Sequence, residues 1–314
     1  MTAWTWLALA GAIVVALVAA AQVRRHAAAR AAGRRFLRHP TASLGVFILA
    51  FFVTLALAAP LVAPYDPTRQ LDPVHLQNQP PSLRFLLGTD VYSRDVWSRL
   101  VYGARLSLGI GTLAMLVAVT VGAGVGALAG YFRHWLDAIL MRGVDVGLAV
   151  PRIFVLLMAV ALWERLPLAA LVLLIGLTGW FVTSRLVRAE VLSLREREFV
   201  AAAQAVGAGP TRVILRHVLP NAAAPIIVSA ALGIGNVILL EAGLSFLGIG
   251  VPSPLPSWGS MIHDGWQWIV AAPWTSGFPG LAIAFVVMAL NAVGDGLRDA
   301  LDPRDTLDPR KEGT

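Results

Sequence analysis

The chain has 314 residues, of which 57% are hydrophobic and 14% charged, and its mean hydropathy is +0.72. This composition is typical of a protein that crosses the membrane several times, and it excludes an ordinary soluble domain. The net charge of +7 is not arranged as a basic stripe interleaved with aromatic residues, which argues against nucleic acid as a partner, and the absence of cysteine excludes disulfides, thiolate catalysis and cysteine-ligated metals.

The first apolar segment covers residues 4–23 and has about the length that a bilayer requires of one helix. No basic residue precedes it, whereas six arginines follow it between residues 24 and 38. This charge order is unlike that of a cleaved signal peptide, and it favours an external N-terminus followed by a cytoplasmic basic linker. The alternative interpretation is that translation starts further along the chain and the segment is not made.

Six further apolar segments predict six more membrane spans, at residues 43–63, 106–130, 146–163, 168–187, 221–243 and 275–296. A long polar segment with several prolines separates the first two of these spans and is predicted to be external. With this topology, 18 of the 25 arginine and lysine residues lie in cytoplasmic segments, and the C-terminus is cytoplasmic. The positive-inside rule supports this arrangement of an all-α polytopic membrane protein.

Residues 188–221 form the longest polar interruption in the second half of the chain. Ser193 and Glu196 have the spacing of a capping box, which predicts that a helix starts there. The apolar side chains that follow lie three and four residues apart, and hence on one helical face: Phe199, Ala203 and Val206. The helix is expected to end at Gly207 and Gly209.

A second short helix is expected after these glycines. Pro210 favours a helix start because its missing N–H is not needed in the first turn, and Leu219-Pro220-Asn221 ends the pair before the next span. Four arginines lie on this helix–turn–helix: Arg195, Arg197, Arg212 and Arg216. Such a structure outside the bilayer predicts a docking surface for another protein rather than a slack connection.

This stretch resembles the cytoplasmic "EAA" loop of ABC importer permeases, whose pattern is Glu-Ala-Ala, three residues, Gly, nine residues and Ile-x-Leu-Pro. Two positions depart from it, because Ala201 stands in the place of the Glu and His217 in the place of the Ile. In the family this loop is the coupling helix, which sits in a groove on the ATPase subunit. The resemblance implies that role for Glu196, Glu198, Ala202, Ala203, Gly207, Leu219 and Pro220.

Two more stretches resemble one branch of this family. Residues 88–103, GTDVYSRDVWSRLVYG, are similar to the peptide-permease pattern Gly-Thr-Asp-x-x-Gly-Arg-Asp-Val-x-Ser-Arg-Leu-x-Tyr-Gly, with Ser93 in the place of a Gly. Residues 294–304, GDGLRDALDPR, resemble the C-terminal pattern of the same family. The chain is thus similar to the C-type permease subunit of the dipeptide, oligopeptide and nickel branch, over about residues 43–304.

The resemblance implies a six-helix type I ABC importer core with one extra N-terminal transmembrane helix. The expected domains are 1–42 (extra helix and basic linker), 43–105 (first core helix and external segment), 106–304 (permease domain with the coupling loop 188–221) and 305–314 (cytoplasmic tail). The implied partners are a B-type permease subunit, two ABC ATPase subunits, an extracytoplasmic substrate-binding protein and the lipid bilayer of the bacterial cytoplasmic membrane. The family's substrates are di- or oligopeptides, with nickel complexes and glutathione in side branches.

The sequence contains no pattern of a catalytic or metal site. Its only lysine is Lys311, so it has no phosphate-binding loop of the Gly-x-x-x-x-Gly-Lys-Ser/Thr kind, and ATP and Mg are expected to be used by partner ATPase subunits. The six histidines are scattered without the spacing of metal ligands. We therefore expect a chain that is not itself an enzyme and binds no cofactor.

Charged residues in or beside the spans are the candidates for a translocation path, because ionisable groups inside a membrane normally face protein or water. They are Glu241, Arg152 (which follows Pro151, where a kink would turn it inward) and Asp145. The alternative interpretation is structural: ion pairs between packed helices, such as Arg142 with Asp145 three residues on. Three glycines spaced four residues apart within a span, Gly122, Gly126 and Gly130, predict a close approach between helices.

Two other functions remain open from the sequence. The chain could be a secondary transporter driven by protons, with Glu241 or Asp145 as the relay. It could also be a membrane scaffold that transports nothing. Dependence of uptake on an ATPase partner rather than on a proton gradient distinguishes the importer from both.

Overall fold

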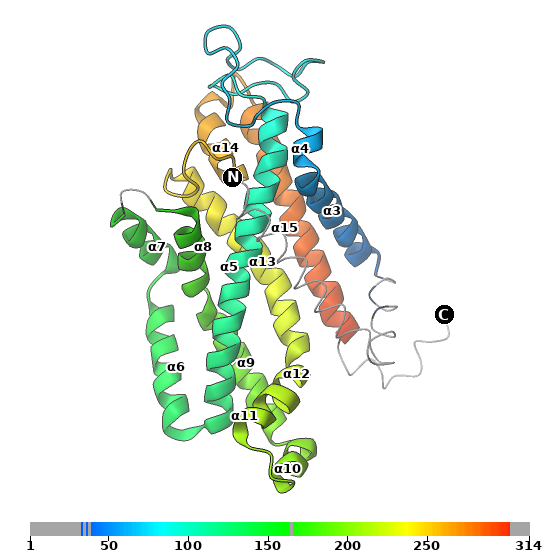
Figure 1. Ribbon diagram of the computed structural model, residues 1–314, viewed down its shortest axis with the longest axis vertical. Coiled ribbons are helices and arrows are strands. Elements are labelled where there is room, and N and C mark those ends of the chain that lie inside the picture. Colours follow the sequence, from blue (N-terminus) through cyan, green and yellow to red (C-terminus); the bar gives the residue numbers. More distant parts are fainter. Residues whose placement is uncertain (1–32, 34–35, 37–38, 164–165, 302–314) are drawn as a thin grey trace.

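The computed structural model describes residues 33, 36, 39–163 and 166–301. The predicted span at residues 4–23 and the tail at 305–314 lie outside the described residues. In the part of the chain that is described, an elongated bundle of helices forms, and the only strand-like pairing is an isolated bridge between Thr89 and Asp95 (Figure 1). The predicted all-α class is confirmed.

Six segments of the described chain have the length and composition of membrane spans. Five are α3 (Pro40–Leu57), α5 (Val96–Phe132), α8 with α9 (Leu168–Leu177 and Trp180–Arg195), α13 (Ala223–Phe246) and α15 (Trp274–Leu301). The sixth is a broken pair, α6 (His134–Ala149) and α7 (Arg152–Ala161). The shorter elements are α4 (Ala59–Val62), α10 (Glu198–Ala205), α11 (Pro210–Val213), the π-helical turn η1 (Ile214–Val218), α12 (Leu219–Asn221), α14 (Trp258–Gly265) and the 3₁₀ turn η2 (Trp266–Trp268). The described part of the chain therefore has five candidate spans, or six when the bent pair is counted as one, which agrees with the six core spans predicted from the sequence.

The bundle has two distinct ends. The loop elements α10 to α12 lie at one end, here called the α10 end, and α14 lies at the other with the segment between α4 and α5, here called the α14 end (Figure 1). The basic residues of the loop are thus separated from α14 by the length of the spans.

The span predicted at residues 146–163 has different boundaries in the structure. Its helix begins at His134 and ends at Ala149, and the chain then bends by 77° before α7. Val150 is extended, with φ −94° and ψ 125°, because a proline restricts the residue before it and offers no N–H to continue the helix. The apolar run continues across Pro151, so hydropathy alone did not locate the bend.

Helix α5 is longer than the predicted span 106–130, since it begins at Val96. The Asp95 carboxylate caps it by accepting hydrogen bonds from the Ser98 backbone N–H (2.8 Å) and hydroxyl (2.6 Å). Burial raises the pKa of the Asp95 carboxyl above its ordinary value, while the hydrogen bonds from Ser98 act in the opposite direction. A domain boundary at residues 105 and 106 would cut through this helix.

The helix start predicted at Ser193 is wrong. Helix α9 continues through Ser193 to Arg195, and α10 begins at Glu198 after an extended Arg197. Val187 and Val191 on α9 are fully buried, and burial of this apolar stripe outweighs the local tendency of Ser193 to cap a new helix.

A glycine seam on α5, formed by Gly122, Gly126 and Gly130, packs against α9. A Cβ atom added at Gly122 would lie 2.8 Å from the Trp180 carbonyl oxygen, and one at Gly130 would lie 2.9 Å from that of Arg188. At Gly126 an added Cβ would collide with the Ser184 carbonyl oxygen. The close helix approach predicted from the spacing is confirmed, and only glycine permits it here.

The α14 end is held together by a buried ion cluster. Arg94 contacts Asp90 and Asp264 at 2.7 Å each, and Arg99 contacts Asp264 at 3.0 Å. Both arginine side chains are almost completely buried, so removing their carboxylate partners would leave a buried unpaired charge and destabilise the fold. Because Asp264 belongs to α14 and the other three belong to the stretch 88–103, this motif fastens the segment before α5 to α14.

Two turns within this stretch have the left-handed backbone that favours glycine. Gly88 has φ +77°, and an added Cβ would lie 2.7 Å from the Trp274 indole nitrogen. Ser93 has φ +58°, which gives a physical reason for the glycine in the family pattern at this position.

The glycine seam yields a prediction about stability. Replacing Gly126 by Ala should lower the thermal midpoint of the purified protein, corresponding to a loss of about 1–3 kcal/mol, because the methyl group must push α9 away. The matched control is Gly124→Ala on the same helix, where an added Cβ meets no atom within 4 Å. Equal melting temperatures for the two variants would show that the seam does not limit the packing of α5 on α9.

Candidate functional site

The candidate site is the loop from Arg197 to Asn221, which projects from the α10 end of the bundle (Figure 1). Its inner side is apolar and buried against the ends of α5 and α9. The loop contributes Val200, Val213, Ile214 and Val218, and the spans contribute Ala127, Tyr131, Val187 and Val191. The loop is therefore packed onto the spans through its own small core.

Polar contacts brace the loop in addition. Arg133, in the turn between α5 and α6, forms an ion pair of 2.6 Å with Glu196. Arg195 donates a hydrogen bond to the Tyr131 carbonyl oxygen, and Gln204 donates one to the Tyr131 hydroxyl at 3.2 Å. Glu196, predicted to contact an ATPase, is thus engaged within its own chain, although 64% of its side chain remains exposed.

The turn between α10 and α11 depends on Gly207. Its φ is +86°, and its N–H donates to the Gln204 carbonyl oxygen at 2.9 Å. Gly209, in contrast, has an ordinary extended conformation with φ −68°, and Pro210 follows as the first residue of α11. The predicted helix break at Gly207 and the helix start at Pro210 are confirmed.

The loop then joins α13 through a π-helical turn. The Leu219 N–H donates to the Ile214 carbonyl oxygen, one residue further back than in an α-helix. Pro220 has no N–H to donate, and the Asn221 side chain donates instead to the His217 carbonyl oxygen at 2.6 Å. Leu219 and Pro220 therefore lie where the π-helical turn of the loop leads into α13.

The outer side of the loop is exposed and largely apolar or small. Val206 is 91% exposed and Leu215 60% exposed, although both are aliphatic. Other exposed residues of the loop include Phe199, Ala201, Ala202, Ala205 and Gly207, and the charged Arg197, Glu198, Arg212 and Arg216. Ala203 is half-buried and packs against the loop's core.

The sequence predicted that Phe199, Ala203 and Val206 share one helical face; in the structure Phe199 and Val206 are exposed, and Ala203 is half-buried. Val200 faces inward instead, and it is fully buried. Helix α10 starts at Glu198, five residues after Ser193, where the capping-box spacing placed the helix start. Leu215 was missed altogether, because a π-helical turn alters the periodicity from which helix faces are read.

The three charged candidates for a path lie at different places. Arg152 donates from Nε to the Thr178 hydroxyl at 3.1 Å and from Nη2 to the Ile175 carbonyl oxygen, so it binds the break between α8 and α9. Pro151 does turn this side chain inward, as predicted. The Ile175 carbonyl oxygen, at the end of α8, also accepts a hydrogen bond from the Thr178 hydroxyl at 3.2 Å.

Glu241 is completely buried in α13. Its Oε1 atom accepts hydrogen bonds from the Ser245 hydroxyl at 2.6 Å and from the Ser257 hydroxyl at 2.9 Å. Ser257 also caps α14, accepting from the Ser260 N–H at 3.1 Å. Glu241 therefore connects α13 to the start of α14.

Asp145 is about half exposed on α6. It pairs with Arg185 on α9 at 2.5 Å, and with Arg142 at the longer distance of 4.0 Å. The predicted pair with Arg142 is present, but the shorter pair links two spans. Within the described part of the chain, no group of three His, Asp or Glu side chains has a geometry that could hold a metal ion.

Comparison with known families and proteins gives consistent results. Residues 122–305 match the family described as binding-protein-dependent transport system inner membrane component, and residues 29–81 match the N-terminal TM domain of oligopeptide transport permease C. A dipeptide transport system permease protein, DppC, of Alkalihalophilus pseudofirmus is 42% identical over 280 residues, covering 88% of this chain and 90% of that protein. A putative peptide transport system permease protein of Brucella abortus is 41% identical over 273 residues, covering 86% and 90%.

A similar fold occurs in a solved structure. The MetNI methionine ABC transporter, in an inward-facing conformation, contains a chain that superposes with a TM-score of 0.54 at 17% identity, covering 65% of this chain and 96% of that one. At this identity the similarity shows only a shared fold, that of type I importer permeases. The family match spans more than half of the sequence and includes the whole loop from Arg197 to Asn221. The chain therefore belongs to the binding-protein-dependent transport system inner membrane components, and it is a permease subunit of an ABC importer.

Proposed function

We propose that this permease carries di- or oligopeptides across the bacterial cytoplasmic membrane, and that the loop from Arg197 to Asn221 docks on an ABC ATPase subunit. The peptide substrate is inferred from relatives whose names specify dipeptide or peptide transport. The observation that carries the docking role is the two-sided loop: one side is packed on the spans, and the other presents exposed aliphatic side chains. Such a patch outside the bilayer favours a protein partner.

The anchorage of the loop explains how movement would reach the membrane. A force applied to α10 acts on α9 and α5 through Val200, Val213 and Val218, which are fully buried between them. The Arg133–Glu196 ion pair adds a contact to the start of α6. Because a packed core transmits displacement with little compression, the loop would move with its spans rather than hinge away from them.

The proposed partners follow from the family and from the missing phosphate-binding loop in this sequence. ATP and Mg would be used by two ABC ATPase subunits at the α10 end, which is then the cytoplasmic end. The α14 end would face an extracytoplasmic binding protein that delivers the peptide. A B-type permease subunit would complete the path, and the C-terminus would lie in the cytoplasm and the N-terminus outside.

Of the three charged candidates, Asp145 best suits a position on the translocation path. Its side chain is about half exposed on α6, beside Arg142, which is 82% exposed. Glu241, through Oε1, and Arg152 instead form hydrogen bonds with groups of their own chain. Membership of the ABC importer family provides no support for a proton relay or for a scaffold without transport.

The turn at Gly207 gives a direct test of the loop. Gly207→Val should abolish peptide uptake by the assembled transporter, and ATP hydrolysis should no longer respond to the loaded binding protein. A β-branched residue with φ +86° costs about 1–2 kcal/mol or more and would reshape the turn. Uptake and ATPase rates in proteoliposomes provide the measurement.

The matched control for this test is Gly209→Val. Both glycines stand in open space with no atom within 4 Å of an added Cβ, and they differ in backbone conformation. Gly209 has a φ that any residue adopts, so its variant should keep most of the uptake. Normal transport by Gly207→Val would count against the assigned role of the turn.

The role of Glu241 can be separated from that of a proton relay. Glu241→Gln should retain uptake, because the amide oxygen still accepts hydrogen bonds from Ser245 and Ser257. Glu241→Leu removes that acceptor, and it should loosen α14 and reduce both thermal stability and uptake. A Gln variant that folds and assembles normally but transports nothing would favour proton transfer at this position.

A further inference from the structure

The outer side of the loop combines exposed aliphatic side chains with unpaired positive charge. Val206 is 91% exposed and Leu215 60% exposed. The side chains of Arg197, Arg212 and Arg216 are exposed as well, and within the described chain none of them forms an ion pair or a side-chain hydrogen bond. These three charges are therefore available to a group outside this chain.

Arginines that face the spans have partners instead. Arg133 pairs with Glu196 at 2.6 Å, and Arg188 pairs with Asp137 at 2.5 Å. These ion pairs join α6, and the turn before it, to α9 and the start of the loop. The arginines of this region thus form two sets, one that fastens the loop to the spans and one that takes no part in that anchorage.

The loop itself carries more positive than negative charge. Residues 197–221 contain three arginines against one glutamate, an excess of two positive charges with His217 counted as neutral. The glutamate, Glu198, lies in the first turn of α10, where a carboxylate stabilises the helix end. Ala201 stands where the family pattern has a Glu, so the loop also lacks the carboxylate of that pattern.

The spacing of Arg212 and Arg216 favours a negatively charged partner. They are four residues apart, in α11 and η1, and like charges at this spacing on a helix repel each other. Within the described chain no ion pair offsets that repulsion. Carboxylates of a docked protein would remove it and would be attracted by both guanidinium groups.

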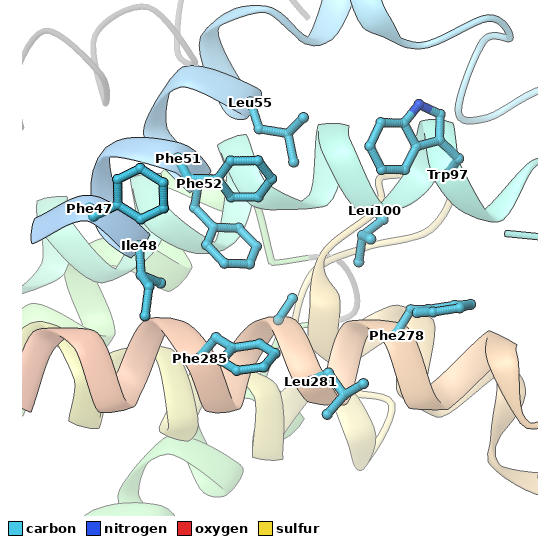
Figure 2. A pocket seen from close by; sticks show the side chains of 11 residues that line it. Phe47, Ile48, Phe51, Phe52, Leu55, Trp97, Leu100, Phe278, Leu281 and Phe285 are labelled. Carbon is cyan, nitrogen blue, oxygen red and sulfur yellow. The ribbon is translucent and has the colours of Figure 1, made fainter. Parts of the chain in front are cut away.

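An apolar groove elsewhere on the bundle has no such charges. It lies between α3, the start of α5 and α15, and Figure 2 shows aromatic side chains on its two walls. Its lining, which belongs to the described chain, contains no charged residue. Exposed apolar side chains on this molecule therefore need not be accompanied by positive charge. Their combination with arginine on the loop is typical of protein interfaces.

We infer that the ATPase surface that receives this loop has an apolar floor bordered by carboxylates, and that Arg212 and Arg216 select it. The inference rests on the proposed docking of the loop, and it adds the chemistry of the partner surface. The aliphatic side chains Val206 and Leu215 supply the apolar contact. The arginines at its border orient the partner and exclude an ATPase subunit whose border is basic, because Ala201 offers no carboxylate to such a border.

Binding of the purified ATPase subunit to the permease pair in phosphatidylcholine nanodiscs tests this chemistry. For the unchanged permease, added salt should weaken binding, because salt screens attraction between opposite charges. The double variant Arg212→Glu with Arg216→Glu should raise the Kd at low salt by about tenfold or more, and added salt should then strengthen binding. The double variant Arg212→Gln with Arg216→Gln should weaken binding less and remove most of its salt dependence.

A single variant outside the loop provides the matched control for Arg212→Glu. Arg298 is exposed near the α10 end of α15, so Arg298→Glu makes the same change of charge at the same end of the bundle. Its affinity and salt dependence should equal those of the unchanged permease. The thermal midpoint of each variant reports folding, and the Gln pair keeps the test valid if the Glu pair does not assemble.

The other outcomes are distinct. Equal affinity and salt dependence for all variants would leave the docking in place and overturn the role of the charges. An effect of the Glu pair that occurs only in nanodiscs containing phosphatidylglycerol would assign the arginines to lipid headgroups. An equal effect of Arg298→Glu would show a general effect of charge at this end of the bundle. An unchanged permease pair that binds no ATPase subunit would contradict the proposed function and the inference together.

Discussion

The close contact between α5 and α9 is the constraint on which the rest of the structure depends. Gly122, Gly126 and Gly130 bring the α9 backbone so near that an added methyl group has no space. Two spans held at this distance leave a shared apolar surface at the α10 end, on which the loop from Arg197 to Asn221 packs. The position of the loop is therefore set by the packing of α5 on α9. A displacement of the loop would shift these two helices with it.

The charged groups of the spans mostly serve this architecture. Arg152 binds a carbonyl at the end of α8, Glu241 holds the serine that caps α14, and Asp145 joins α6 to α9. At the α14 end, the Arg94 and Arg99 cluster fastens the segment before α5 to α14 through Asp264. The two ends thus differ: one is held together by buried charges, and the other exposes aliphatic side chains.

The sequence predicted the core spans of the described region, the glycine seam and the turn at Gly207, because each depends on a local pattern of apolar or small residues. It failed where distant residues decide the local structure. The capping signal at Ser193 was outweighed by burial of Val187 and Val191, and the partner of Glu196 is Arg133, which no spacing rule connects to it. Hydropathy gave one span at residues 146–163 because it carries no information about backbone geometry, whereas Pro151 indicated the kink that the structure shows there.

The most direct test of the central claim is a cross-link from the exposed tip of the loop in the assembled transporter. Val206→Cys, the only thiol in the chain, would carry a photoreactive maleimide, and Val74→Cys at the α14 end provides a matched exposed valine. The account predicts that the Val206 site links to an ATPase subunit and that the Val74 site does not. Failure of the Val206 site to reach an ATPase subunit, or its linkage to the extracytoplasmic binding protein, would contradict it.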